Sequence, residues 1–240
     1  MFDRSAPGVQ DRGPMSQPRL FEIRNYQPAD RARVRELCCE TGFLGKPIDP
    51  VFEDRELFAD YLTAYYTDWE AESSFVLLVN GEIRGYLLGS RWPLRQQCHA
   101  FYQNISLFLR GIFRYPRYSE ASKKFVQWIF RTAWREVPAA PRRTAHFHIN
   151  LLADARRVAT SRALVDSYLR YLYACGEKRV YGQMVVFEDR RGTKMFERYG
   201  FKVVNKAEIT KYRDVHPAPV YLCTVVKDLD ENSQLYAKAG

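Results

Sequence analysis

Hydrophobic and polar residues along the first seventy positions follow short-range patterns that predict one strand and two helices. Alternation of apolar and polar residues across 21–26 predicts a strand. Asp30 can cap the helix that follows, because its apolar residues share one face (Val34, Leu37 and Cys38). A stripe of large side chains predicts a second helix (Leu57, Phe58, Tyr61, Leu62 and Tyr65).

A hairpin is expected next, because two β-rich runs, 74–79 and 82–88, flank the dipeptide Asn80-Gly81. The second half predicts a strand at 145–152 and a helix at 159–174 that Gly176 ends. Further predicted elements alternate between strand and helix (strand 180–187, short helix 190–199, strands 201–204 and 220–226). This order predicts an α+β domain in which helices flank one mixed central sheet.

Composition supports one folded body of 240 residues, of which 46% are hydrophobic and 15% aromatic. These fractions exclude a collagen-like, coiled-coil or wholly disordered chain. The formal net charge is +9, a balance that favours an anionic partner. The segment 91–143 holds eleven basic and two acidic residues, so it accounts for the whole surplus.

The ends of the chain and its cysteines predict an intracellular protein. Residues 1–19 lack the apolar core of a signal peptide and are interpreted as a flexible leader, and 229–240 as a polar tail. No run is long and apolar enough to predict a transmembrane helix. The five cysteines lack the paired spacing of a zinc site, so we expect buried free thiols, no metal and a cytoplasmic location.

The most informative join is 151–164, a strand end, a short basic loop and the start of a helix. The first N–H groups of a helix have no intrahelical partner and carry partial positive charge, which together favour an anion. Ala159 and Ser161 are small enough for a diphosphate to approach, and Arg156, Arg157 and Arg162 add charge. An ordinary loop with solvated arginines is the alternative that these residues alone leave open.

Two motifs resemble those of the GCN5-related N-acetyltransferase (GNAT) superfamily, whose members use acetyl coenzyme A. The run Arg156-Arg157-Val158-Ala159-Thr160-Ser161 is similar to the family's diphosphate loop, with both glycines replaced. The run 189–201 is similar to the family's second motif and ends in the identical Gly200-Phe201. Asp189 stands where that motif has Asn, and Phe196 where it commonly has the tyrosine that protonates the leaving thiolate.

The resemblance implies a GNAT-like domain over 20–228, with a helical insertion between the third and fourth strands. It implies acetyl-CoA as the acyl donor, direct attack of an amine on the thioester and no metal. The residues that the resemblance assigns to the donor lie on the strand end, the loop and the second motif (Leu151, Leu152, Arg156, Arg157, Val158, Ala159, Thr160, Ser161, Asp189 and Phe196).

Direct attack requires the acceptor amine to lose a proton. His146, His148 and Asn150 alternate onto one face of the strand that leads to the loop. A histidine that titrates near neutrality is a suitable base, so His148, or a water that it holds, is the predicted acceptor of the proton. Asn150 is its predicted neighbour and Tyr199 the predicted alternative acid, although these histidines can also be ordinary hydrogen-bonded sheet residues.

Segment 91–143 also holds eleven aromatic residues, and 105–113 and 125–134 are apolar enough to be helices. A lid over the acceptor site and a homodimer contact are its first interpretations. An acidic or lipid-like acceptor, a membrane surface and single-stranded nucleic acid are the others, since all three favour basic residues interleaved with aromatics.

The sequence therefore predicts an acetyl-CoA-dependent N-acetyltransferase that acts on a primary amine of a small molecule or peptide. The alternative is a catalytically weak acyl-CoA-binding domain that docks a protein, membrane or nucleic acid through 91–143. A fold does not choose the acceptor, so the sequence leaves it unnamed.

Overall fold

The computed structural model describes residues 20–187 and 194–229. Its centre is a seven-stranded sheet in the order β1-β2-β3-β4-β5-β7-β6. The strands lie in two groups along the chain (β1, Phe21–Asn25; β2, Ser74–Val79; β3, Glu82–Ser90; β4, Ala145–Leu151; then β5, Arg179–Phe187; β6, Lys202–Glu208; β7, Val220–Asp228). Every neighbouring pair is antiparallel except β4 and β5, which are parallel.

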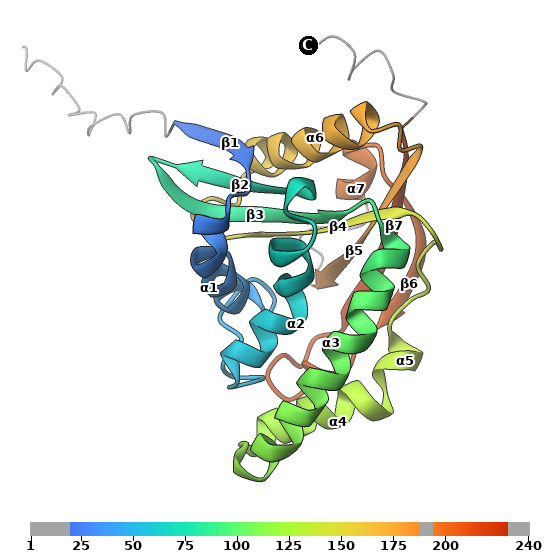
Figure 1. Ribbon diagram of the computed structural model, residues 1–240. Helices are drawn as coiled ribbons and strands as arrows, with labels where there is room; N and C mark the ends of the chain where they lie inside the picture. Colours follow the sequence, from blue (N-terminus) through green and yellow to red (C-terminus); the bar gives the residue numbers. More distant parts are fainter. Residues whose placement is uncertain (1–19, 188–193, 230–240) are drawn as a thin grey trace, which may run out of the picture.

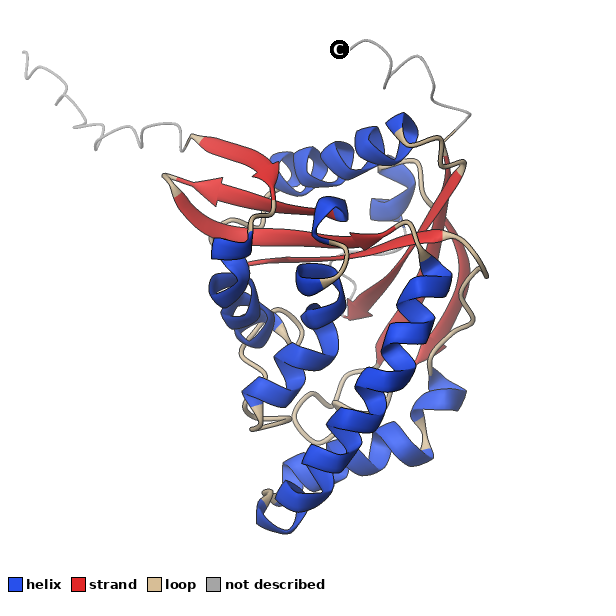
Figure 2. Cartoon of the chain, in the orientation of Figure 1, coloured by secondary structure: helices blue, strands red, loops and turns tan. Residues whose placement is uncertain are grey.

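Helices cover both faces of this sheet (Figures 1 and 2). One face carries α6 (Val158–Ala174) and α7 (Lys194–Arg198). The other face carries α1 (Arg31–Thr41) and α2 (Arg55–Asp68). Each face has its own buried cluster, so the sheet separates two cores. This arrangement is the mixed α+β architecture that the sequence predicts.

A helical segment connects β3 to β4 beside α2 (Figure 1). It comprises α3 (Pro93–Arg114), α4 (Glu120–Arg131) and the short α5 (Ala133–Glu136). The predicted helices 105–113 and 125–134 are too short and wrongly bounded, because α3 begins where Pro93 takes its first turn and α4 where Ser119 caps it. Among the described residues, none of the helices combines the length and apolar character needed to cross a bilayer.

Local sequence explains the elements that frame the site. Asn80 and Gly81 adopt φ of 54° and 82°, the left-handed conformation that a two-residue hairpin turn requires. At the other end of the domain, Leu229 is fully buried and its N–H donates to the Lys178 carbonyl oxygen. The folded body therefore extends through Leu229, a residue that the sequence prediction assigned to the tail. The leader 1–19 and the rest of the tail lie outside the described residues.

Three of the five thiols are buried as expected, namely Cys38, Cys39 and Cys223, and all five are free. Cys98 on α3 is exposed and Cys175 is half-buried, so for these two the expectation of burial is wrong. Desolvation raises the pKa of Cys38 to about 12, which makes that thiol inert at neutral pH.

Candidate functional site

The site begins where β4 and β5 separate. The two strands pair only from Ala145 to Phe147, opposite Val180 to Gly182, and β4 continues to Leu151 with β3 as its one partner. Leu152 N–H donates to the Arg84 carbonyl oxygen. Because backbone groups alternate along an antiparallel pair, Ile149 and Leu151 direct theirs toward the side that β5 has left.

A cavity of about 1520 Å³ fills this separation and extends between the sheet and the helical segment. It exceeds the volume of common small-molecule pockets, about 300–1000 Å³. One end is lined by the α6 loop and α7, including Arg157, Ser161 and Tyr199. The other end is lined by α2, α3, α4 and the segment after β6, including Tyr61 and Lys211. We refer to these as the loop end and the aromatic end.

The loop end is held by side chains whose roles differ from those that the sequence predicts. Thr160 is buried, and its hydroxyl oxygen lies 2.6 Å from the Ala155 carbonyl oxygen and 3.2 Å from Arg157 N. The Arg156 guanidinium donates to the carbonyl oxygens of Leu151, at 3.0 Å, and Gly45, at 3.3 Å. The side chains of Thr160 and Arg156 therefore stabilise the conformation of the loop through these hydrogen bonds, rather than binding an anion.

Arg157 is exposed, caps α6 and lines the cavity together with Val158 and Ser161. As the first residues of α6, Val158 and Ala159 have N–H groups without an intrahelical partner, beside the exposed guanidinium. The combination of a helix start, a small residue and an arginine can receive a phosphate.

Of the predicted donor-binding residues, six line the cavity (Leu151, Arg156, Arg157, Val158, Ser161 and Phe196). The structure does not bring Leu152, Ala159 or Thr160 into the lining, and the Leu152 amide is already bonded to Arg84. Ile149 takes its place as the strand residue beside Leu151. Asp189 lies outside the described residues.

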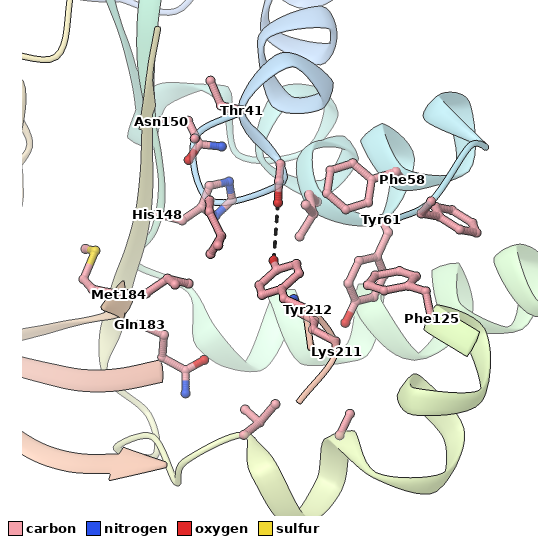
Figure 3. A pocket seen from close by; sticks show the side chains of 18 of the residues that line it. Thr41, Phe58, Tyr61, Phe125, His148, Asn150, Gln183, Met184, Lys211 and Tyr212 are labelled. Atoms are coloured by element: carbon pink, nitrogen blue, oxygen red, sulfur yellow. Dashed lines mark hydrogen bonds between the residues drawn. The ribbon is translucent and has the colours of Figure 1, made fainter. Parts of the chain in front are cut away.

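The three predicted catalytic residues, His148, Asn150 and Tyr199, all line the cavity. Figure 3 shows His148 and Asn150 on β4 directed into it. Asn150 Nδ2 donates to Tyr86 Oη at 2.8 Å, which orients the amide. Tyr199 lies at the loop end, where its hydroxyl is 3.4 Å from the Val158 carbonyl oxygen.

His148 is enclosed by aromatic rings. Tyr66 and Tyr86 meet its ring edge to face, with centroids at 4.9 and 6.0 Å. Its Nε2 atom is buried without a hydrogen-bond partner among the described residues. Desolvation lowers the pKa of His148 to about 3, so the expectation of a base that titrates near neutrality is wrong. At neutral pH this imidazole is uncharged.

His146 lies deeper on the same strand and behaves as a sheet residue. Its Nε2 atom is 3.0 Å from Tyr66 Oη, and burial lowers its pKa to about 4. Unlike His148, His146 does not line the cavity, so it has a structural position in the sheet and does not face the site.

The aromatic end contains residues that the sequence reasoning missed. Tyr212 is buried, and its hydroxyl donates to the Gly42 carbonyl oxygen at 3.4 Å (Figure 3). Lys211 Nζ lies 5.7, 5.1 and 4.8 Å from the ring centroids of Phe125, Trp128 and Tyr212. The sequence predicts only a loop between β6 and β7, because the contacts of this segment with α4 join residues more than eighty positions apart.

No protein-family model matches the chain, and no curated protein matches its sequence. Solved structures do match its fold. SsHAT aligns with a TM-score of 0.55 and 24% identity over 87% of this chain and 98% of its own. An N-acetyltransferase from Staphylococcus aureus Mu50 aligns with a TM-score of 0.51 and 13% identity over 88% of this chain and 99% of its own.

A polyamine N-acetyltransferase from Drosophila melanogaster also aligns, with a TM-score of 0.51 and 11% identity over 87% of this chain and 99% of its own. These likenesses extend over nearly the whole of each neighbour. The chain therefore shares the fold of these solved structures, two of which are described as N-acetyltransferases.

Proposed function

We propose that this protein is an acetyl-CoA-dependent N-acetyltransferase that transfers an acetyl group to a primary amine by direct attack on the thioester. The observation that carries the proposal is the separation of β4 from β5, with the α6 loop at one end of the resulting cavity and His148 and Asn150 on its wall. The fold neighbours support it, because two of them are described as N-acetyltransferases.

The residues present fit acetyl-CoA. Its long arm carries amides, and the backbone of Ile149 and the Leu151 N–H offer hydrogen-bonding groups on the side of β4 without a strand partner. The Leu151 carbonyl oxygen already accepts from Arg156. Its diphosphate is anionic, and Arg157, Ser161 and the start of α6 offer donors and positive charge. When bound, acetyl-CoA would supply the thioester that the acceptor amine attacks.

The chain's own contribution is to orient the amine and exclude water. His148 is neutral, so its unpaired Nε2 can accept a hydrogen bond from the amine or from a water that carries the proton away. Asn150, held by Tyr86, can fix the direction of approach. Tyr199 supplies a hydroxyl at the loop end, whereas Phe196 is buried and has no proton to donate.

Titration calorimetry with acetyl-CoA tests donor binding. Arg157→Ala should weaken binding about tenfold, because it removes a charge-assisted contact worth roughly 1.5 kcal/mol. Arg170→Ala is the matched control, since Arg170 is an exposed arginine of α6 that does not line the cavity. Absence of affinity at high micromolar acetyl-CoA would contradict the proposal.

Thiol release with a panel of amines then tests catalysis. Release that depends on both acetyl-CoA and an amine supports the enzyme. Tight binding of acetyl-CoA without release from any amine would instead support an acyl-CoA-binding domain. The acceptor, a homodimer and a cytoplasmic location stay predictions.

A further inference from the structure

Helix α3 turns its apolar face outward. Eight large hydrophobic side chains of this helix are between 47% and 80% exposed (Leu94, Phe101, Tyr102, Ile105, Phe108, Leu109, Ile112 and Phe113). From 101 to 113 they recur three or four residues apart, so they form one continuous stripe.

Helix α3 meets α2 through polar groups and through His99, whose ring packs on Tyr65 and Trp69, while the stripe stays exposed. Gln103 donates to the Asp60 carbonyl oxygen, and Arg110 forms an ion pair with the Asp60 carboxylate at 2.6 Å. Leu107 is the buried residue of the helix. A helix that packs on its own domain normally buries its apolar stripe, so the exposed stripe of α3 indicates an external partner.

The same face continues onto the neighbouring helices. Phe108 of α3 and Phe130 of α4 meet edge to face with centroids at 5.6 Å. Ile129, Phe130, Trp134 and Val137 are 40% to 70% exposed. We call these residues, together with the α3 stripe, the outer face.

The segment that carries the outer face also carries the positive charge of the molecule. Six exposed arginines of segment 91–143 form no ion pair within the described part of the chain (Arg95, Arg117, Arg131, Arg135, Arg142 and Arg143). Arg135 instead lies 4.5 Å from the ring centroid of Trp134. The surplus charge of the molecule is therefore available to an anionic partner.

The apolar stripe and the unpaired arginines allow three possible partners of the outer face to be compared. A second copy of this chain would bring the same uncompensated arginines together, which opposes association. Single-stranded nucleic acid is bound by stacking on aromatic planes, but Leu94, Ile105, Leu109 and Ile112 offer none. An anionic bilayer satisfies both features, since it receives apolar side chains below its headgroups and arginines among them.

We propose that the outer face docks the protein on the surface of an anionic lipid bilayer, with α3 lying in the interface. Five of its side chains also line the cavity (Phe108, Ile112, Ile129, Phe130 and Val137). Docking thus places the aromatic end of the cavity beside the bilayer. The proposal depends on the exposed residues of α3 to α5 and stands independently of acetyl transfer.

Vesicle sedimentation with the full chain tests it. The protein should sediment with vesicles of phosphatidylcholine and phosphatidylglycerol at 7:3, and at least tenfold less with phosphatidylcholine alone. Phe101→Ser with Phe113→Ser should weaken binding at least tenfold, whereas Val204→Ser, at a 57% exposed site on β6, should not. Arg131→Gln with Arg135→Gln should lower binding and its salt dependence, and Arg170→Gln should leave both unchanged.

A label on Cys98 reports the geometry of docking. Cys98 is exposed on α3 between Leu94 and Phe101, and in a Cys175→Ser background the other thiols are buried. An environment-sensitive fluorophore there should shift its emission to the blue with the anionic vesicles. The proposal is overturned by failure to bind them, or by binding that the outer-face variants leave unchanged. Two other outcomes also overturn it. One is a dimer that the outer-face variants abolish in a protein that does not bind the vesicles. The other is oligonucleotide binding that those variants abolish in a protein that does not bind the vesicles.

Discussion

Burial decides what His148 can do. Its pKa is lowered to about 3, so the residue is neutral over the whole range in which an acetyl transfer can be assayed. His148→Gln should lower kcat about tenfold or more, because it replaces the unpaired ring nitrogen that faces the amine. It should do so without moving the pH dependence of kcat between pH 6 and 9, since His148 does not titrate there.

His216→Gln is the control for this substitution. His216 also has a buried nitrogen without a partner among the described residues, but it does not line the cavity. Initial rates at saturating acetyl-CoA measure both variants. Wild-type kcat in His148→Gln, or a rate that falls equally in His216→Gln, would remove His148 from the mechanism.

Tyr199 is the hydroxyl at the loop end. If it donates the proton to the departing thiolate, Tyr199→Phe should lower kcat about tenfold and leave the affinity for acetyl-CoA within twofold. Tyr102→Phe, at a 72% exposed site on α3, should change neither. Rates and calorimetric affinities measured on the same preparations separate the two effects, and an unchanged kcat in Tyr199→Phe would contradict the role.

The sequence predicts residues at this scale only in part. Residue types and spacing are enough to bring His148, Asn150, Arg157 and Ser161 to one cavity. They do not indicate which polar groups are already occupied by neighbours, as the hydroxyl of Thr160 is by the Ala155 carbonyl. Nor do they indicate burial, which changes His148 from a base near neutrality to a neutral acceptor.

At the scale of elements, buried Glu70 joins four pieces of the fold. Its carboxylate accepts hydrogen bonds from Tyr65 Oη, Ser73 Oγ, Ser90 Oγ and the Arg91 N–H, at 2.6 to 2.8 Å. It therefore ties the end of α2 to the end of β3 and the approach to α3. A carboxylate buried with this many donors is held by hydrogen bonds rather than by an ion pair.

Glu70→Ala should lower the free energy of unfolding by about 3 kcal/mol or more, because it leaves several buried donors without an acceptor. Glu72→Ala, two residues away on the surface, should change it by less than about 0.5 kcal/mol. Urea denaturation measures both values. Equal stability of the two variants would contradict the structural role of Glu70.

Elements with a local signal are predictable, and those that depend on distant partners are not. Asn80-Gly81 predicts the hairpin because the turn conformation is a property of those two residues. The separation of β4 from β5 has no such signal, since pairing stops at Phe147 while the β pattern continues to Leu151. Helix α3 is longer than the predicted 105–113, because it begins at Pro93, well before the apolar run on which that prediction rests.

At the scale of the whole molecule, two half-buried histidines, His146 and His148, make stability depend on pH. Burial lowers the pKa of His146 to about 4 and that of His148 to about 3, against about 6.5 in the unfolded chain. At a pH between the folded and the unfolded pKa values, the histidines are protonated in the unfolded state and neutral in the folded state. Acidification therefore favours unfolding. Carboxylates with a lowered pKa, such as Asp30 and Asp60, change the free energy of unfolding only at lower pH, because their unfolded forms titrate near 3.8.

The free energy of unfolding should therefore fall between pH 7 and pH 5, by about 2 kcal/mol for each of the two histidines. Urea denaturation at the two pH values measures the difference. His146→Gln with His148→Gln should remove most of it even if the variant is less stable at both, because the slope depends on the protons bound and not on the starting stability. If the free energy of unfolding of the double variant still falls as strongly between pH 7 and pH 5, groups other than these two histidines cause the pH dependence.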